Sequence, residues 1–79
     1  MDAWEYLFVT AVSHDGTLRP CQVNGQELAG WEQITIQDYI RQVGEQGWEL
    51  SGVVTSESGV DQTTRLIFKR PSTEPPRVV

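Results

Sequence analysis

The segment Thr35–Leu50, TIQDYIRQVGEQGWEL, predicts a capped helix that stops at a glycine and leads into a strand headed by tryptophan. Thr35 can accept a hydrogen bond from the first turn, and Asp38 stands at the capping-box spacing, near the positive end of the helix dipole. Apolar residues follow at i, i+3, i+4 and i+7, namely Ile36, Tyr39, Ile40 and Val43. The segment therefore predicts one short helix that packs by a single face against a small sheet.

Two glycines shape the end of this helix. Gly47 is the expected left-handed stop. Gly44 lies inside the helix, where glycine lowers stability relative to alanine. We expect Gly44 to be there because it permits a close approach of the helix to the sheet.

Runs of aromatic and β-branched residues predict the strands. The main strands are Trp4–Val12, Trp48–Ser56 and Thr63–Arg70, and a hairpin of Leu18–Val23 and Gln26–Leu28 precedes the helix. The pairs Asp-Gly at 15–16 and Asn-Gly at 24–25 supply tight turns. The predicted fold class is α+β: a small antiparallel-rich sheet (a β-α-β-β core) with one helix packed on one face and an inserted β-hairpin before the helix.

The length of 79 residues is enough for one domain. We expect a single domain over residues 1–70 and a flexible, proline-rich tail over residues 71–79. The lone cysteine, Cys21, cannot form an internal disulfide and fits a reducing compartment. With one histidine, His14, it cannot complete a closed zinc site without carboxylates, so we expect no metal and no cofactor.

The net charge of −5 argues against nucleic acid and anionic membranes as partners. No apolar stretch is long enough to span a bilayer. The first residues, MDAWEYLFVTAV, lack the basic start of a signal peptide. We therefore expect a cytoplasmic protein.

Both faces of the first strand are apolar, while the helix has one apolar stripe. Trp4, Tyr6 and Phe8 share one face by the period of two, and we expect the helix to cover it. The reverse face would then expose a contiguous apolar patch, which monomers seldom show. Either the hairpin folds over this patch or a second copy does, and a symmetric dimer is the commonest solution. The predicted interface residues are Leu7, Val9, Ala11, Val53 and Ile67.

A cluster of cations suggests a second kind of site. Arg65 and Lys69 lie on one strand face, and Arg41 is a candidate neighbour. Such a cluster could bind an anionic ligand, such as a nucleotide phosphate, between subunits. Alternatively, these side chains pair with glutamates across the sheet. Trp31, which follows the hairpin, either caps the edge of the core or stacks on the ligand.

The residues that could carry catalysis do not form a recognisable set. His14 and Asp15 are adjacent in a glycine turn, and Cys21 has no base near it in sequence. Glu45 and Glu49 flank the helix exit, but we expect them to point into water from separate elements. We therefore assign no catalytic residue, and an enzyme that uses a carboxylate or His14 stays the least favoured alternative.

Three short motifs resemble a known family. They are WEY at residues 4–6, GEQGWEL at residues 44–50 and LIFKRP at residues 66–71. Their order and spacing resemble the small bacterial and phage proteins of domain-of-unknown-function family 4177. The resemblance leaves out residues 13–34. It implies the β-α-β-β core and no activity, and the shared residues read as a packing signature.

Together these features predict a small non-enzymatic binding or assembly module of bacterial or phage origin that acts as a homo-oligomer. Its expected partner is itself, with another protein or an anionic small molecule as further candidates. The alternative is a protein that binds or sequesters an anionic nucleotide. The absence of a nucleophile–base pair and the excess of apolar strand surface favour the assembly module, and a thermal shift with a panel of nucleotides would separate it from the nucleotide binder.

Overall fold

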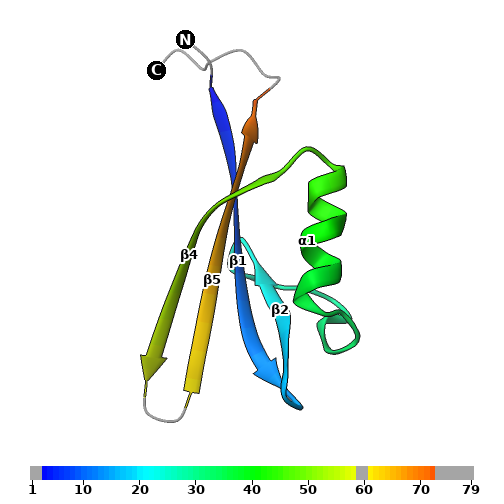
Figure 1. Cartoon of the computed structure of the whole chain (residues 1–79), viewed down its shortest axis with the longest axis vertical. Coiled ribbons are helices and arrows are strands. Elements are labelled where there is room, and N and C mark those ends of the chain that lie inside the picture. Colours follow the sequence, from blue (N-terminus) through cyan, green and yellow to red (C-terminus); the bar gives the residue numbers. More distant parts are fainter. Residues whose placement is uncertain (1–2, 59–60, 73–79) are drawn as a thin grey trace.

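Figure 1 shows the computed structural model, which describes residues 3–58 and 61–72. In chain order, the described elements are β1 (Trp4–His14), β2 (Thr17–Val23), β3 (Gln26–Glu27), the short 3-10 helix η1 (Trp31–Gln33), α1 (Ile36–Glu45), β4 (Glu49–Ser58) and β5 (Asp61–Pro71). The strands form one antiparallel sheet in the order β3-β2-β1-β5-β4.

The predicted α+β class is wrong, because the fold is dominated by its sheet. The hairpin does not stand apart from a three-stranded core: β2 pairs along β1 from Val9↔Val23 to His14↔Thr17 and so extends the main sheet. β4 and β5 also run longer than predicted and pair as far as Ser58↔Asp61. A single helix of 10 residues accompanies this five-stranded antiparallel sheet. Of the predicted tail, residues 73–79 lie outside the described part of the chain.

The two tight turns form where the sequence predicts them. Asp15 and Gly16 both have positive φ, at 53° and 76°, and so do Asn24 and Gly25, at 51° and 82°. Positive φ at both central residues is the hairpin-turn geometry that Asp-Gly and Asn-Gly favour. Asn24 also fastens its turn to β1, because its side-chain Oδ1 accepts a hydrogen bond from the Phe8 amide at 3.0 Å.

The helix begins and ends as predicted. The Thr35 hydroxyl accepts a hydrogen bond from the Asp38 amide at 3.1 Å, which caps the first turn. Gly47 has a φ of 92° just after the helix. The expected role of Gly44 is wrong, since a Cβ built there would meet nothing within 4 Å. No helix in residues 3–58 and 61–72 has the length and apolar character needed to cross a membrane.

The hydrophobic core lies between α1 and one face of the sheet. The stripe of α1 supplies three buried residues, and the central strands β1 and β5 supply the other four. The core residues are Val9, Ala11, Ile36, Tyr39, Val43, Leu66 and Phe68. The core is therefore only two layers deep, one helix on one sheet.

The helix covers the opposite face of β1 from the one we predicted. In the register of β1 and β5, Leu7 pairs with Phe68 and Tyr6 pairs with Lys69. Directly paired residues share a face of the sheet, so the buried Phe68 brings the aliphatic side of β1 under α1. The aromatic side of β1 consequently lies on the face that carries Lys69.

A β-bulge changes the faces of β4. The pairing steps from Leu50↔Phe68 to Gly52↔Ile67, which leaves Ser51 as the extra residue. Leu50 and Val53 therefore lie on the helix side of the sheet, and Val54 lies on the other. Simple alternation would place Leu50 and Val54 on the same face, but alternation does not hold across a bulge.

Alkaline pH should destabilise the fold through Tyr39. Burial raises the pKa of its hydroxyl above the ordinary value of 10.0. As the pH rises past that value, the unfolded chain loses this proton first, so the free energy of unfolding falls. We expect Tyr39→Phe to lessen this fall relative to the wild type. Urea unfolding below and above pH 10 measures the change in the free energy of unfolding with pH. An equal fall in the wild type and in Tyr39→Phe would contradict the prediction.

Candidate functional site: the open face and free edge of the sheet

The side of the sheet away from α1, called here the open face, is apolar and exposed. Trp4, Tyr6 and Phe8 project from β1 with 45%, 53% and 46% of their surfaces accessible. Their partners on β5 include Lys69 and Ile67. Monomeric proteins seldom leave so many large apolar side chains together in water, so this face is a candidate binding surface.

Aromatic rings and a cation interact along this row. The rings of Tyr6 and Phe8 lie nearly parallel, with centroids 6.5 Å apart and 24° between their planes. The Lys69 Nζ lies 4.6 Å from the centroid of the Trp4 ring. A cation over an indole ring is attracted by its quadrupole. Glu49 is the partner of Lys69 in the register with β4.

A shallow hollow of about 240 Å³ lies farther along the open face. Its lining divides into an apolar part and a polar part. The apolar part comprises Phe8, Val54 and Ile67, and the polar part comprises Ser56, Thr63 and Arg65. Arg65 pairs with Thr10 on one side and Val54 on the other, both uncharged, and no ion pair of Arg65 occurs among the side chains that the structure describes.

The two edges of the sheet differ sharply. The β3 edge has only two residues, which is one way that proteins protect an edge. The β4 edge has 10 residues. From Ser51 to Ser56 it carries no charge and no proline, and Val53 and Val54 are 55% and 53% exposed. Apart from the bulge, this stretch has none of the usual devices that block pairing with another chain.

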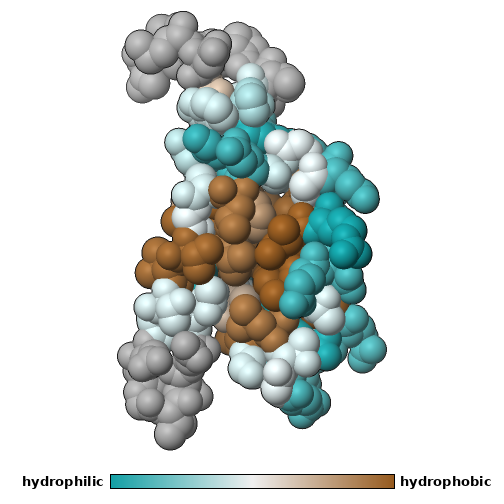
Figure 2. All heavy atoms as spheres, viewed as in Figure 1, coloured by the Kyte–Doolittle hydropathy of each residue, from teal (hydrophilic) through white to brown (hydrophobic). Residues whose placement is uncertain are grey.

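The helix leaves part of its own face uncovered. In Figure 1, the link from α1 to β4 passes in front of β1 and β5, so the viewer looks at the side that α1 covers. Figure 2 shows hydrophobic residues visible on this side between α1 and β4. Leu50 and Val53, which belong to the helix side of β4, are accordingly exposed. β4 thus shows apolar side chains on both of its faces.

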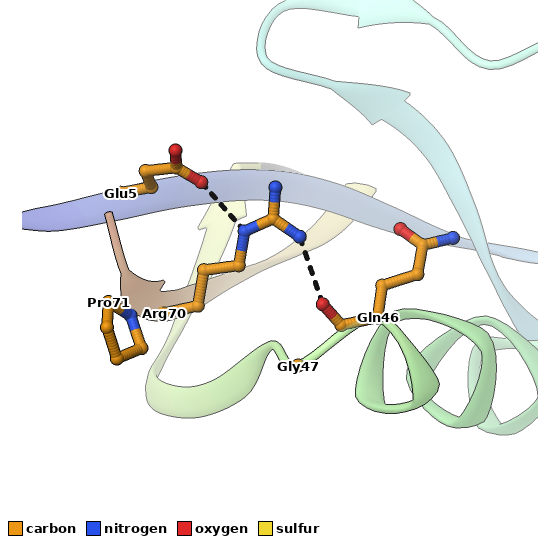
Figure 3. A pocket seen from close by; sticks show the side chains of 5 residues that line it. All are labelled: Glu5, Gln46, Gly47, Arg70 and Pro71. Carbon is orange, nitrogen blue, oxygen red and sulfur yellow. Dashed lines mark hydrogen bonds and ion pairs between the residues drawn. The ribbon is translucent and has the colours of Figure 1, made fainter. Parts of the chain in front are cut away.

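A larger hollow of about 420 Å³ lies where α1 ends, and Arg70 is held in place there (Figure 3). The Arg70 Nε donates to the Glu5 carboxylate at 2.7 Å, and Nη1 donates to the Gln46 carbonyl at 3.0 Å. Its guanidinium also stacks 4.2 Å from the centroid of the Trp48 ring. Because its contacts join β1, β5 and the exit of α1, Arg70 is a structural clamp.

The four residues predicted to bind a ligand do not come together. Arg65 and Lys69 share the open face. Arg41 lies on the exposed side of α1, where it pairs with Asp38 at 3.5 Å. The Trp31 ring packs edge-on against the His14 ring, with the two centroids 5.2 Å apart. The Trp31 Nε1 donates a hydrogen bond to the Glu27 Oε1 at 3.4 Å. Within one chain, Arg41 and Trp31 therefore lie apart from the open face, which carries Arg65 and Lys69, and the ligand set stays a prediction.

The predicted interface is wrong at its centre. Val9 and Ala11 are fully buried beneath α1, and Leu7 packs against the same core. The side chains of Val9 and Ala11 cannot meet a second copy without opening the core, and Leu7 is only partly buried beside them. Ile67 lies on the open face, opposite Phe8, and Val53 is exposed on β4, so these two positions stay available.

Sequence reasoning missed the residues of the open face because it assigned them to the core. Aromatic size suggested burial, but a strand with two apolar faces does not reveal which face the helix covers. The signal that could have found them was in β5, where Leu66 and Phe68 alternate with Arg65 and Lys69. The face of β5 that carries the cations had to be the one facing solvent.

The candidate catalytic residues make structural contacts and do not form a catalytic set among the residues that the structure describes. His14 is 3.6 Å from Asp15 at the exposed end of β1. Burial, together with the nearby Glu27 carboxylate, raises the pKa of the Cys21 thiol, which keeps it protonated and a poor nucleophile. The thiol donates to the Thr10 carbonyl at 3.4 Å. Glu45 ends α1 while Glu49 begins β4 opposite Lys69.

Comparison with protein-family models gives no match for this chain, and comparison with curated proteins gives none either. The resemblance to family 4177 stays a prediction from short motifs. Those motifs do meet in space, since Glu5, Trp48 and Arg70 come from the three segments and form the clamp.

Proposed function

We propose that the protein is a non-enzymatic assembly module that forms a symmetric homodimer through the edge of β4. In this dimer, β4 of each copy pairs antiparallel with β4 of the other, so two five-stranded sheets become one continuous sheet. The observation that carries the proposal is the long, uncharged, exposed edge over residues 51–56. An unprotected edge of this kind is a template for pairing with another chain.

Symmetry supports a second copy as the occupant. A strand that pairs antiparallel with its own copy is related to it by a twofold axis, which gives a closed dimer. Such pairing would place Val53 of each copy close to the partner strand and bury part of its exposed surface. The bulge at Ser51 bends the beginning of β4, so the pairing region is residues 52–56.

The charges of the open face favour the edge over the face as the place where copies meet. A twofold interface brings the same patch of both copies together. On the open face it would bring Arg65 and Lys69 of the two copies toward each other, and like charges across an interface are unfavourable. The edge segment of residues 51–56 has no such cost. We place the dimer in the cytoplasm, as the composition predicts.

Two lysines on β4 test the proposal. Val53 and Thr55 pair with Leu66 and Thr64 and lie on the helix side, so Val53→Lys/Thr55→Lys leaves the open face untouched. In the dimer the four added lysines would crowd together, and Lys is a natural blocker of edges. We expect sedimentation velocity to show a dimer for the wild type and a monomer for the double variant.

The control is Gln22→Lys/Gln26→Lys, which adds the same charge at exposed sites beside the short β3 edge. This variant should sediment as the wild type does. A wild type that stays monomeric across the concentration series refutes the proposal, and so does a Val53→Lys/Thr55→Lys protein that remains dimeric.

A further inference from the structure

We infer that the hollow on the open face binds a nucleoside monophosphate, with its base on the apolar part and its phosphate on the polar part. The inference stands apart from the proposed dimer, because it concerns the open face and not the edge of β4. It rests on three observations: the exposed aromatic side chains, an Arg65 that forms no ion pair with any described side chain, and the division of the hollow into two chemically different parts.

The apolar part offers a surface for a planar ring. Phe8 is about half exposed and lies beside Ile67. On the other side of Ile67 lies Gly52, which contributes no side chain. An exposed aromatic ring such as that of Phe8 can bind the face of a base by stacking, typically worth about 1–3 kcal/mol per base.

The polar part offers partners for a phosphate. Arg65 presents a guanidinium, whose fork of donors suits phosphate oxygens. The hydroxyl-bearing residues Ser56 and Thr63 line the same hollow and can donate to an anion. Among the side chains that the structure describes, no carboxylate lines the hollow and none forms an ion pair with Arg65.

The distance between the two parts suits one nucleotide. Ile67 and Arg65 are two residues apart on β5, which places them about 7 Å apart along the strand. A ligand that touches both therefore needs a ring and an anionic group joined by a short linker, as in a base, a ribose and a 5′-phosphate. A free base or a free phosphate satisfies only one part.

The electrostatics of the chain select a small anion. The net charge of −5 would repel a long polyanion over its whole length. Arg65 and Lys69 nevertheless give the open face a local positive character, with Glu49 opposite Lys69. A ligand with one phosphate can use this local field without spanning the acidic surfaces.

The test is isothermal titration of the full chain with adenosine 5′-monophosphate, adenosine, and inorganic phosphate. We expect the monophosphate to bind, and adenosine and phosphate each to bind at least about tenfold more weakly, because each loses half of the contacts. Phe8→Leu keeps the site apolar but removes the ring, and should weaken binding severalfold.

Matched arginine variants decide whether the hollow is the site. Arg65→Gln should lower the affinity by about tenfold or more, the scale of a lost charged hydrogen bond. Arg41→Gln makes the same charge change on the far side of α1 and should leave the affinity unchanged. The Val53→Lys/Thr55→Lys protein should bind as the wild type does, which separates this site from the dimer.

Two results would overturn the inference. One is the absence of any heat of binding with adenosine 5′-monophosphate up to millimolar concentrations. The other is an equal loss of affinity in Arg65→Gln and Arg41→Gln, which would mean that the nucleotide responds to net charge and not to the hollow. Both variants change exposed side chains, so unfolding should not obscure the result, and circular dichroism checks this.

Discussion

Replacing Val9 with aspartate is expected to unfold the protein, whereas the same replacement at Phe8 is expected to leave it folded. Val9 is 0% exposed and Phe8 is 46% exposed, although they are neighbours on β1. An unpaired carboxylate beneath α1 costs on the order of 5 kcal/mol, which is comparable with the whole stability of a small domain. At position 8 the carboxylate reaches water. The free energy of unfolding should fall by only about 1 kcal/mol, because the half-buried phenyl ring no longer contributes its apolar burial.

Far-UV circular dichroism and urea unfolding measure the difference. The Val9→Asp protein should lose the cooperative transition, and the Phe8→Asp protein should keep it with a lower midpoint. Because Phe8 lines the hollow, Phe8→Asp should also lose nucleotide binding. A folded but dissociated Val9→Asp protein would instead support the interface that we predicted from the sequence, and would contradict the placement of β1 under α1.

The second prediction compares the same substitution at two arginines: Arg70→Met should lower the free energy of unfolding, and Arg19→Met should not. Arg70→Met removes the bonds to Glu5 and to the Gln46 carbonyl but keeps a side chain that can pack on Trp48. Charged hydrogen bonds contribute about 1.5–3 kcal/mol each. Since both Arg70 and Glu5 are about one-third exposed, we expect a net loss of only about 1–2 kcal/mol.

Arg19→Met is the matched substitution. The Arg19 Nε is buried and has no hydrogen-bond partner in the part of the chain that the structure describes. A buried donor without a partner costs free energy, and an apolar side chain of similar length removes that cost. We expect Arg19→Met to leave the free energy of unfolding unchanged or to raise it by up to about 1 kcal/mol. Urea midpoints of the two variants give the comparison, and equal losses would contradict the clamp.

The local elements of this fold could be predicted from the sequence. The Thr35 cap, the apolar stripe of α1 and the stop at Gly47 each depend on residues a few positions apart, and so do the turns at Asp15-Gly16 and Asn24-Gly25. Their geometry follows from side-chain capping and from the φ values that Asn, Asp and Gly tolerate. The alternation of Leu66 and Phe68 with charged residues likewise identified the inner face of β5.

The candidate sites were harder to predict, because they depend on contacts between distant segments. The register of β1 with β5 joins residues about sixty positions apart and decides that Val9, and not Phe8, lies under α1. The bulge at Ser51 decides which side of the sheet Val53 and Val54 occupy. Neither the register nor the bulge can be detected from the periodicity of its own segment. The predicted interface and ligand set therefore contained residues that the fold separates.

By itself, the sequence determined one helix, its ends, the tight turns and the existence of apolar strands, since these arise from interactions within a few residues. The tertiary structure alone decided which face of β1 is covered, that β4 is the long free edge, and that Arg65 lies in a hollow while Arg70 is bound in a clamp. The physical reason is that a strand with two apolar faces can pack either way. Only pairing with a strand whose inner face is unambiguous, here β5, fixes its orientation.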